Sequence, residues 1–78
     1  MRTKFTPEVG KIYQNQSGGT FRCLEVVGLP FENKAILQNT ESLWTFQANG
    51  CGMYDDGTID WGYSTGGYFA EEEEAWQN

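Results

Sequence analysis

The chain contains no histidine, and among its 78 residues it has only two cysteines, two prolines and five basic side chains. Without histidine, the commonest general base and the commonest metal-binding side chain are both missing. Five scattered Lys and Arg residues cannot form the clustered basic surface that neutralises nucleic-acid phosphates. We therefore expect no enzyme, no cofactor and no direct contact with nucleic acid.

The two cysteines, Cys23 and Cys51, have no CxxC motif or other ligand cluster beside them. Cys23 lies within TFRCLEVV and is predicted to be a packed strand residue, whereas Cys51, between two glycines, is predicted to be more accessible. Whether they form a disulfide is left open. With no signal-peptide pattern and no apolar run of membrane-spanning length, we expect a cytoplasmic protein with no membrane contact and reduced thiols.

The net charge of −6 is concentrated near the C-terminus, where residues 71–74 are four glutamates. Residues 1–70 carry seven acidic and five basic side chains and are nearly neutral. An acidic run at a terminus is typical of a solvated tail. The sequence therefore predicts one small domain over residues 1–70 and an acidic, flexible tail over residues 71–78.

Short β-type runs alternate with turn signals along the chain, and no segment before residue 69 has helical periodicity. The turn signals include QNQSGG at residues 14–19 and Asp-Gly at residues 56–57. The predicted strands cover residues 9–13, 20–27, 34–38, 43–48 with a continuation to 53–54, and 59–63. Five short strands bent by glycines predict an all-β fold, a small five-stranded antiparallel SH3-like barrel.

The aromatic residues divide into expected core and expected surface. Alternation within the strands predicts a core containing Phe21, Ile36, Trp44, Phe46, Ile59 and Trp61. The inward face of TFRCLEVV stays open, because Phe21 and Cys23 alternate with Leu24 and Val26.

Other aromatic rings fall at strand ends, in a loop or near the tail. Phe31 is the most notable, since GLPFEN would place an apolar ring at the tip of a long loop. Rigid aromatic rings among Ser, Gly and Asn are typical of protein-recognition surfaces. We predict a protein-binding face, with self-association as one form of it, formed by Phe31, Tyr54, Tyr63 and Tyr68.

The segment STGG at residues 64–67 allows an alternative. Backbone N–H groups at glycines can bind an anion, and hydroxyl groups can add hydrogen bonds. In this alternative Ser64, Thr65, Gly66 and Gly67, with Trp61 for stacking, bind or sequester a nucleotide-like ligand, in an oligomer that completes the pocket. No lysine or following helix completes a phosphate loop, and the same residues serve as a turn by which the chain leaves the barrel.

Three carboxylates, Asp55, Asp56 and Asp60, lie close together in the sequence. Calcium loops space their ligands as D-x-D-x-D-G with a distal glutamate, and DDGTID does not follow that pattern. Turn chemistry accounts for the first two and solvation for the third. We therefore expect no metal site.

The opening GKIYQNQSGGTFRCL and the later segment QNTESLWTFQANGCGMYDDGTIDWGYSTGGYF together resemble short open reading frames of phages and prophages of Gram-positive bacteria. The resemblance covers residues 9–69. It implies an accessory protein of a mobile element, one that modulates host defence or another phage component. No functional residues carry over from it.

Overall fold

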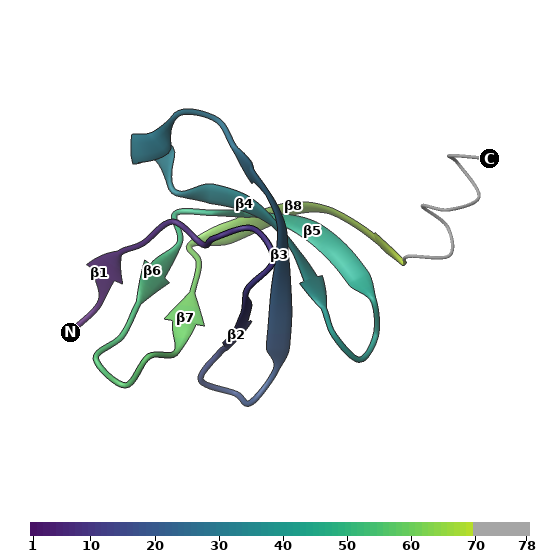
Figure 1. The fold of residues 1–78 in the computed structure, drawn as a ribbon, viewed down its shortest axis with the longest axis horizontal. Helices are drawn as coiled ribbons and strands as arrows, with labels where there is room; N and C mark the ends of the chain where they lie inside the picture. The colour runs from purple at the N-terminus through teal and green to yellow at the C-terminus, as the bar shows by residue number, and fades with distance from the viewer. Residues whose placement is uncertain (70–78) are drawn as a thin grey trace.

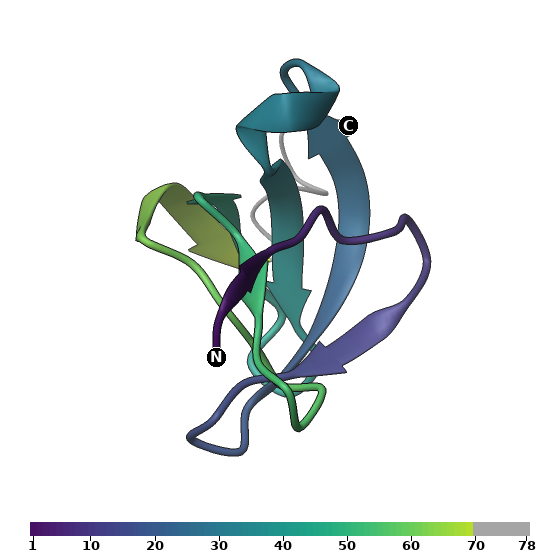
Figure 2. The same ribbon diagram turned by 90° about the vertical axis from the view of Figure 1, so that its left-hand side faces the viewer.

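The computed structural model describes residues 1–69, which form an all-β fold of two antiparallel sheets (Figure 1, Figure 2). The larger sheet has the strand order β2-β3-β4-β5-β8, and the smaller has the order β1-β6-β7. The elements are β1 Thr3–Lys4, β2 Ile12–Gln14, β3 Thr20–Val27, the 3-10 turn η1 Pro30–Glu32, β4 Lys34–Asn39, β5 Trp44–Asn49, β6 Gly52–Met53, β7 Ile59–Asp60 and β8 Tyr63–Phe69. The predicted all-β class is confirmed. Within this described part, no helix has the length and apolar character needed to cross a membrane.

The predicted strands β3, β4 and β5 are confirmed, but the prediction of a single last strand over residues 59–63 is wrong. Residues 59–60 form β7 in the smaller sheet, and the chain then crosses to the larger sheet as β8. Residues 64–67, predicted as an exit turn, instead belong to β8, where Ser64 pairs with Ala48 and Thr65 with Gln47. Alternation of apolar residues does not reveal where a strand changes sheet.

Two hairpin turns predicted from glycine positions are confirmed and share one geometry. In the β2–β3 turn, the Gly18 N–H donates to the Asn15 carbonyl at 3.1 Å, and Gly18 has a φ of 94°. In the β6–β7 turn, the Gly57 N–H donates to the Tyr54 carbonyl at 2.9 Å, and Gly57 has a φ of 87°. A type I turn followed by a glycine in the left-handed region closes both hairpins.

A β-bulge in β3 determines which of its side chains face the core. Cys23 pairs with Leu37 and Glu25 pairs with Ile36, so Leu24 is the extra residue. Phe21 and Cys23, N-terminal to the bulge, are 7% and 1% exposed. The bulge bends the strand and changes its alternation, which is why sequence alternation left the inward face open.

Both sheets contribute to one core, which consists of Phe21, Cys23, Ala35, Leu37, Phe46, Ala48, Cys51 and Ile59. Trp61 packs against it while half-buried, as do Phe5, Tyr13 and Met53. Two predicted core residues are wrong: Trp44 is 39% exposed, and Ile36 is half-buried but, unlike Trp61, is not among the side chains packed against the core. In β4 the buried positions are the neighbours of Ile36, because Ala35 and Leu37 face the core.

The two sheets meet at one isolated bridge between Asn15, just after β2, and Ile59 of β7. A backbone hydrogen bond from Phe5 to Cys51, at 3.0 Å, ties the N-terminal segment to the connection between β5 and β6. Within residues 1–69 no continuous strand pairing joins the two sheets, so they do not close into a barrel.

Candidate functional site

The connection between β3 and β4 presents two apolar side chains to solvent. Phe31, in η1, is 74% exposed, and Leu29 before it is 56% exposed. A chain this short has little apolar surface to spare from its core, and exposed apolar groups placed together indicate an interaction site. We refer to residues 28–33 as the apolar turn. Figure 1 shows η1 projecting at one end of the molecule.

The side chain of Glu32 fixes the start of the apolar turn. Its Oε1 accepts a hydrogen bond from the Leu29 N–H at 2.6 Å, and its Oε2 lies 3.3 Å from the Lys34 ammonium. The hydrogen bond from the Leu29 N–H, supported by Lys34, lowers the pKa of the Glu32 carboxyl below its usual range. The carboxylate is thus held in the charged form that best accepts both contacts.

Asn33 fixes the other end of the apolar turn. It has a φ of 55°, in the left-handed region, and its Nδ2 donates to Thr6 Oγ1 at 2.9 Å. Its carbonyl accepts the Cys51 N–H at 3.0 Å. At Gly28, with a φ of 72°, a Cβ would collide with Glu32 Oε1. The backbone of the apolar turn is therefore anchored at both ends although its apolar side chains are exposed.

Tyr54, another predicted partner-binding residue, takes part in a polar network of the smaller sheet. Its hydroxyl donates to Asp60 Oδ2 at 2.9 Å, and the other carboxylate oxygen of Asp60 is paired with the Arg2 guanidinium. The hydrogen bond to Asp60, with desolvation and the nearby charge, raises the pKa of the Tyr54 hydroxyl. The Tyr54 hydroxyl is consequently already engaged within the chain.

The structure does not bring the predicted partner-binding residues to one face. The β6–β7 hairpin, which carries Tyr54, and η1, which carries Phe31, lie at opposite ends of the molecule (Figure 2). Tyr63 starts β8 and is 62% exposed. Tyr68 pairs with Thr45 through its backbone, and its side chain lies outside what the structure describes, as does the predicted tail over residues 71–78.

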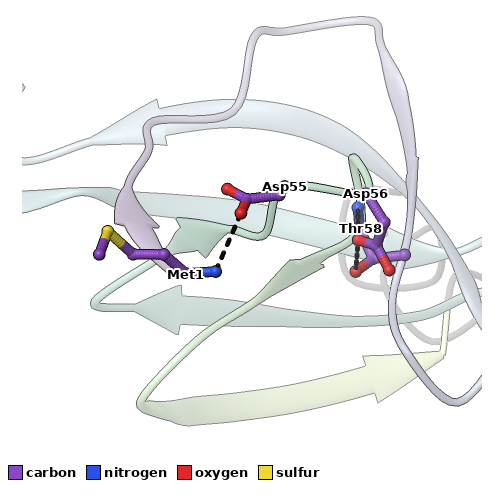
Figure 3. A network of polar contacts seen from close by, with 4 residues as sticks. All are labelled: Met1, Asp55, Asp56 and Thr58. Carbon is purple, nitrogen blue, oxygen red and sulfur yellow. Dashed lines mark hydrogen bonds and ion pairs between the residues drawn. The ribbon is translucent and has the colours of Figure 1, made fainter.

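The neighbouring carboxylates Asp55 and Asp56 of the β6–β7 hairpin both make contacts within the chain (Figure 3). Asp56 Oδ1 accepts from Thr58 Oγ1 at 2.6 Å and from the Thr58 N–H at 2.9 Å, and these two bonds lower the pKa of Asp56. Asp55 Oδ2 lies 3.1 Å from the N-terminal amine of Met1 in an exposed ion pair. Over residues 1–69, no three His, Cys, Asp or Glu side chains are grouped so that they could hold a metal ion.

Trp61 lies at an open pocket of about 300 Å³ where the two sheets meet. The pocket is lined by Asn15, Gln16, Ser17, Ile59, Asp60 and Trp61. The predicted ligand residues Ser64, Thr65, Gly66 and Gly67 do not line it, because they belong to β8. The structure therefore separates Trp61 from the other residues of the predicted nucleotide site.

Several residues of these sites were not predicted from the sequence. The apolar character of Leu29 beside Phe31, within GLPF, was the signal that could have identified it. For residues 15–17 no local signal exists, because their proximity to Trp61 depends on the long-range bridge between Asn15 and Ile59.

Both cysteines are buried free thiols, and the prediction of an accessible Cys51 is wrong. Cys51 is fully buried, its carbonyl accepts the Phe5 N–H, and its Sγ lies 3.7 Å from the Ala48 carbonyl. Burial, and then the proximity of Cys23, raise the pKa of the Cys51 thiol to about 11. Glycines on both sides of a cysteine do not imply an exposed thiol, because another segment of the chain, here the one that contains Phe5, can pack beside it.

No family model, curated protein sequence or solved structure matches the chain. Its function is therefore inferred from the geometry of the described residues.

Proposed function

We propose that this chain is a non-enzymatic binding module that docks a protein partner through the apolar turn, with Phe31 as the anchor. The observation that carries the proposal is that Phe31 is 74% exposed on a backbone fixed by Glu32 and Asn33. An aromatic side chain on a pre-ordered turn loses little conformational entropy when it is buried by a partner. Such anchors supply much of the binding energy of protein interfaces.

The geometry favours the apolar turn over the open edge of β8 as the docking element. Gly66 in β8 has a φ of 73°, and the pairing with β5 shifts register between Thr45 and Gln47. Bulges of this kind interrupt the regular row of backbone groups that an added strand would need. Tyr54, Tyr63 and Tyr68 stay predicted contributors, and of these Tyr63 has an exposed side chain.

We further propose that the two sheets are the halves of a partly open SH3-like barrel. The bridge between Asn15 and Ile59 supports it, because this isolated parallel pairing joins the larger sheet to the smaller one. An experimental structure in which the sheet edges lie far apart would rule out this arrangement.

The proposed biological setting is an accessory protein of a phage or other mobile element, acting in the cytoplasm on a host-defence component or a phage protein. This setting is supported by the resemblance of residues 9–69 to short open reading frames of phages and prophages of Gram-positive bacteria. Self-association through the same turn is the simplest form of protein docking, and light scattering after size-exclusion chromatography tests it directly.

The docking proposal is tested by capturing partners from host cells with the wild-type chain and with Phe31→Ala and Leu29→Ala. Tyr63→Ala is the comparison variant, because it removes a comparably exposed aromatic ring from a different element and shows whether Tyr63 also contributes to binding. Phe31 and Tyr63 are both mostly solvated, so we expect the loss of either ring to alter the free energy of unfolding by no more than about 0.5 kcal/mol. Lost binding can then be assigned to the surface rather than to the fold.

We expect a purified partner identified in this way to bind Phe31→Ala about 30-fold or more weakly, as for a hot-spot residue of about 2 kcal/mol. Tyr63→Ala should bind within about threefold of the wild type if the apolar turn is the principal anchor. Equal affinity of wild type and Phe31→Ala for every captured protein would refute docking through this turn.

The alternative function, sequestration of a nucleotide-like ligand by Trp61 with residues 64–67, has one supporting observation. Trp61 borders a pocket, but the other four residues lie elsewhere on β8. Titration with nucleotides, followed by tryptophan fluorescence, tests it. An unchanged tryptophan fluorescence across adenine and guanine nucleotides would refute the nucleotide-binding alternative.

A further inference from the structure

The pocket beside Trp61 combines groups from both sheets and lies apart from the apolar turn. Residues 15–17 reach it from the β2–β3 hairpin, and Ile59 and Asp60 reach it from β7. Figures 1 and 2 show this hairpin and β7 close together at the end of the molecule opposite η1. Its volume of about 300 Å³ is at the small end of the range for ligand sites.

The apolar wall of the pocket is held rigidly from the core side. The ring centroid of Trp61 lies 5.1 Å from that of Phe21, with the planes at 86°, and 5.1 Å from that of Phe46. The edge-to-face contact with Phe21 and the tilted contact with Phe46 fix the orientation of the indole while part of it stays exposed. Trp61 is half-buried and can therefore offer an ordered aromatic surface to a ligand.

The residues that the β2–β3 turn adds to the pocket offer hydrogen-bonding groups that carry no charge. Asn15 Oδ1 is used by the turn, where it accepts the Gly19 N–H at 2.8 Å and the Ser17 hydroxyl at 3.0 Å. That arrangement orients the Asn15 amide group, and its Nδ2 makes no hydrogen bond to any residue in the described part of the chain. The side chain of Gln16 makes no hydrogen bond to any residue that the structure describes. Both donors and acceptors are therefore present without a formal charge.

The one charged group of the pocket, Asp60, is already compensated. Its carboxylate is paired with Arg2 and accepts the Tyr54 hydroxyl at 2.9 Å. Arg2 in turn also donates to the Gly50 carbonyl. A phosphate would find no uncommitted cation here, and an organic cation would compete with Arg2 for the carboxylate. These contacts favour a neutral ligand.

We propose that this pocket binds a small neutral polyhydroxylated ligand, a single sugar ring. The apolar face of the ring lies on Trp61, and its hydroxyl groups exchange hydrogen bonds with Gln16 and Asn15. At an ordinary binding efficiency of about 0.3 kcal/mol per non-hydrogen atom, we expect one isolated ring to bind in the millimolar range. The inference does not depend on docking through the apolar turn, because the two sites share no residue.

The test is a titration of the ¹⁵N-labelled full chain with glucose and with N-acetylglucosamine, followed by two-dimensional NMR. The Trp61 indole N–H signal, assigned with Trp61→Phe, reports on one wall, and the Gln16 side-chain amide reports on the other. Inorganic phosphate, AMP and tetramethylammonium serve as charged probes. Gln16→Ala is compared with Gln14→Ala, the same change on the same hairpin at a residue that does not line the pocket.

We expect saturable shifts at both walls with at least one of the two sugars and weaker responses to the three charged probes. Gln16→Ala should weaken sugar binding by about 2- to 10-fold, the effect of one lost hydrogen bond, and Gln14→Ala should leave it unchanged. Preferential binding of phosphate, AMP or tetramethylammonium would overturn the neutral ligand class. No saturable shift with either sugar, or equal sugar affinity of Gln16→Ala and wild type, would overturn the site.

Discussion

The guanidinium group of Arg2 lies directly over Gly52, so that a Cβ at residue 52 would come within 2.6 Å of Arg2 Cζ. From this place Arg2 reaches both the Asp60 carboxylate and the Gly50 carbonyl. Gly52 pairs with Lys4 of β1 in the smaller sheet. The absence of a side chain at residue 52 thus allows the N-terminal segment to be tied across this sheet by Arg2.

We predict that the effect of Gly52→Ala on the free energy of unfolding has opposite signs in the wild type and in Arg2→Ala. In the wild type it displaces Arg2 from its partners and destabilises the fold by up to about 1 kcal/mol, because a half-exposed ion pair and one hydrogen bond are lost. With Arg2→Ala the obstruction is gone, and alanine should stabilise the strand by about 0.5–1 kcal/mol relative to glycine. Urea unfolding of the four chains of this double-mutant cycle measures the coupling. The same effect in both backgrounds would contradict the contact.

Glu32 makes the stability of the apolar turn dependent on pH. Its pKa is lowered in the folded chain, first by the Leu29 N–H and then by Lys34. Folding therefore favours the charged form, and this contribution is complete at neutral pH and is lost as the pH falls below the ordinary value of 4.5. We expect wild type to be more stable than Glu32→Gln at neutral pH, with the difference shrinking on acidification. A difference that does not depend on pH would exclude the charged contact as its cause.

Asn33 adopts a backbone conformation that most residues avoid, with a φ of 55°. Asn33→Ala should destabilise the fold by about 1–2 kcal/mol, since alanine is strained there and the contact with Thr6 is lost. Asn33→Gly loses the same side-chain contact but adopts this conformation readily, so its loss should be smaller. The free energies of unfolding of both variants, measured in denaturant, test this explanation. Equal losses of stability would show that backbone strain is not the cause.

Local signals in the sequence were sufficient for the two hairpin turns that contain Gly18 and Gly57 and for three of the strands. Gly18 and Gly57 occupy the positions where their turns require a positive φ, so a few neighbouring residues determined each hairpin. The errors concern long-range geometry. The bulge at Leu24, the transfer of the chain from β7 to β8 and the position of Asn15 beside Ile59 all depend on contacts between segments far apart in the sequence.

The candidate site shows the same division. The exposure of Phe31 followed from its place in GLPFEN, which is a local property. The separation of Phe31 from Tyr54, and of Trp61 from residues 64–67, follows from the arrangement of two sheets that sequence alternation does not encode.

The two buried thiols should react slowly in the folded chain. At about pH 8, a thiol with a pKa of about 11, as for Cys51, is almost entirely protonated, and its burial also hinders the reagent. We expect alkylation of Cys51 in Cys23→Ser to be at least about 100-fold slower in the native state than in denaturant. The same comparison for Cys23 in Cys51→Ser tests the second thiol, whose pKa is also raised by burial. Rapid alkylation of Cys51 in the native state would show that this thiol is accessible, as its flanking glycines suggested.

The adjacent residues Ile36 and Leu37 test which face of β4 forms the core. Leu37 is fully buried and pairs with Cys23 and Phe46, whereas Ile36 is half-buried on the opposite face beside Glu25 and Gln47. Leu37→Ala should cost about 2–5 kcal/mol, because it removes buried methyl groups and leaves a cavity. For a domain with so small a core this can be most of the total stability.

Ile36→Ala removes a side chain of similar size and should cost less than half as much, because solvent already reaches part of it and no closed cavity results. The free energies of unfolding of the two variants, measured in urea and compared with that of the wild type, give the ratio. Both changes replace an aliphatic residue of β4 with alanine, so differences in strand propensity contribute little to the difference between the two unfolding free energies. A greater loss for Ile36→Ala would place the core on the face that sequence alternation predicted and would reverse the arrangement of the larger sheet.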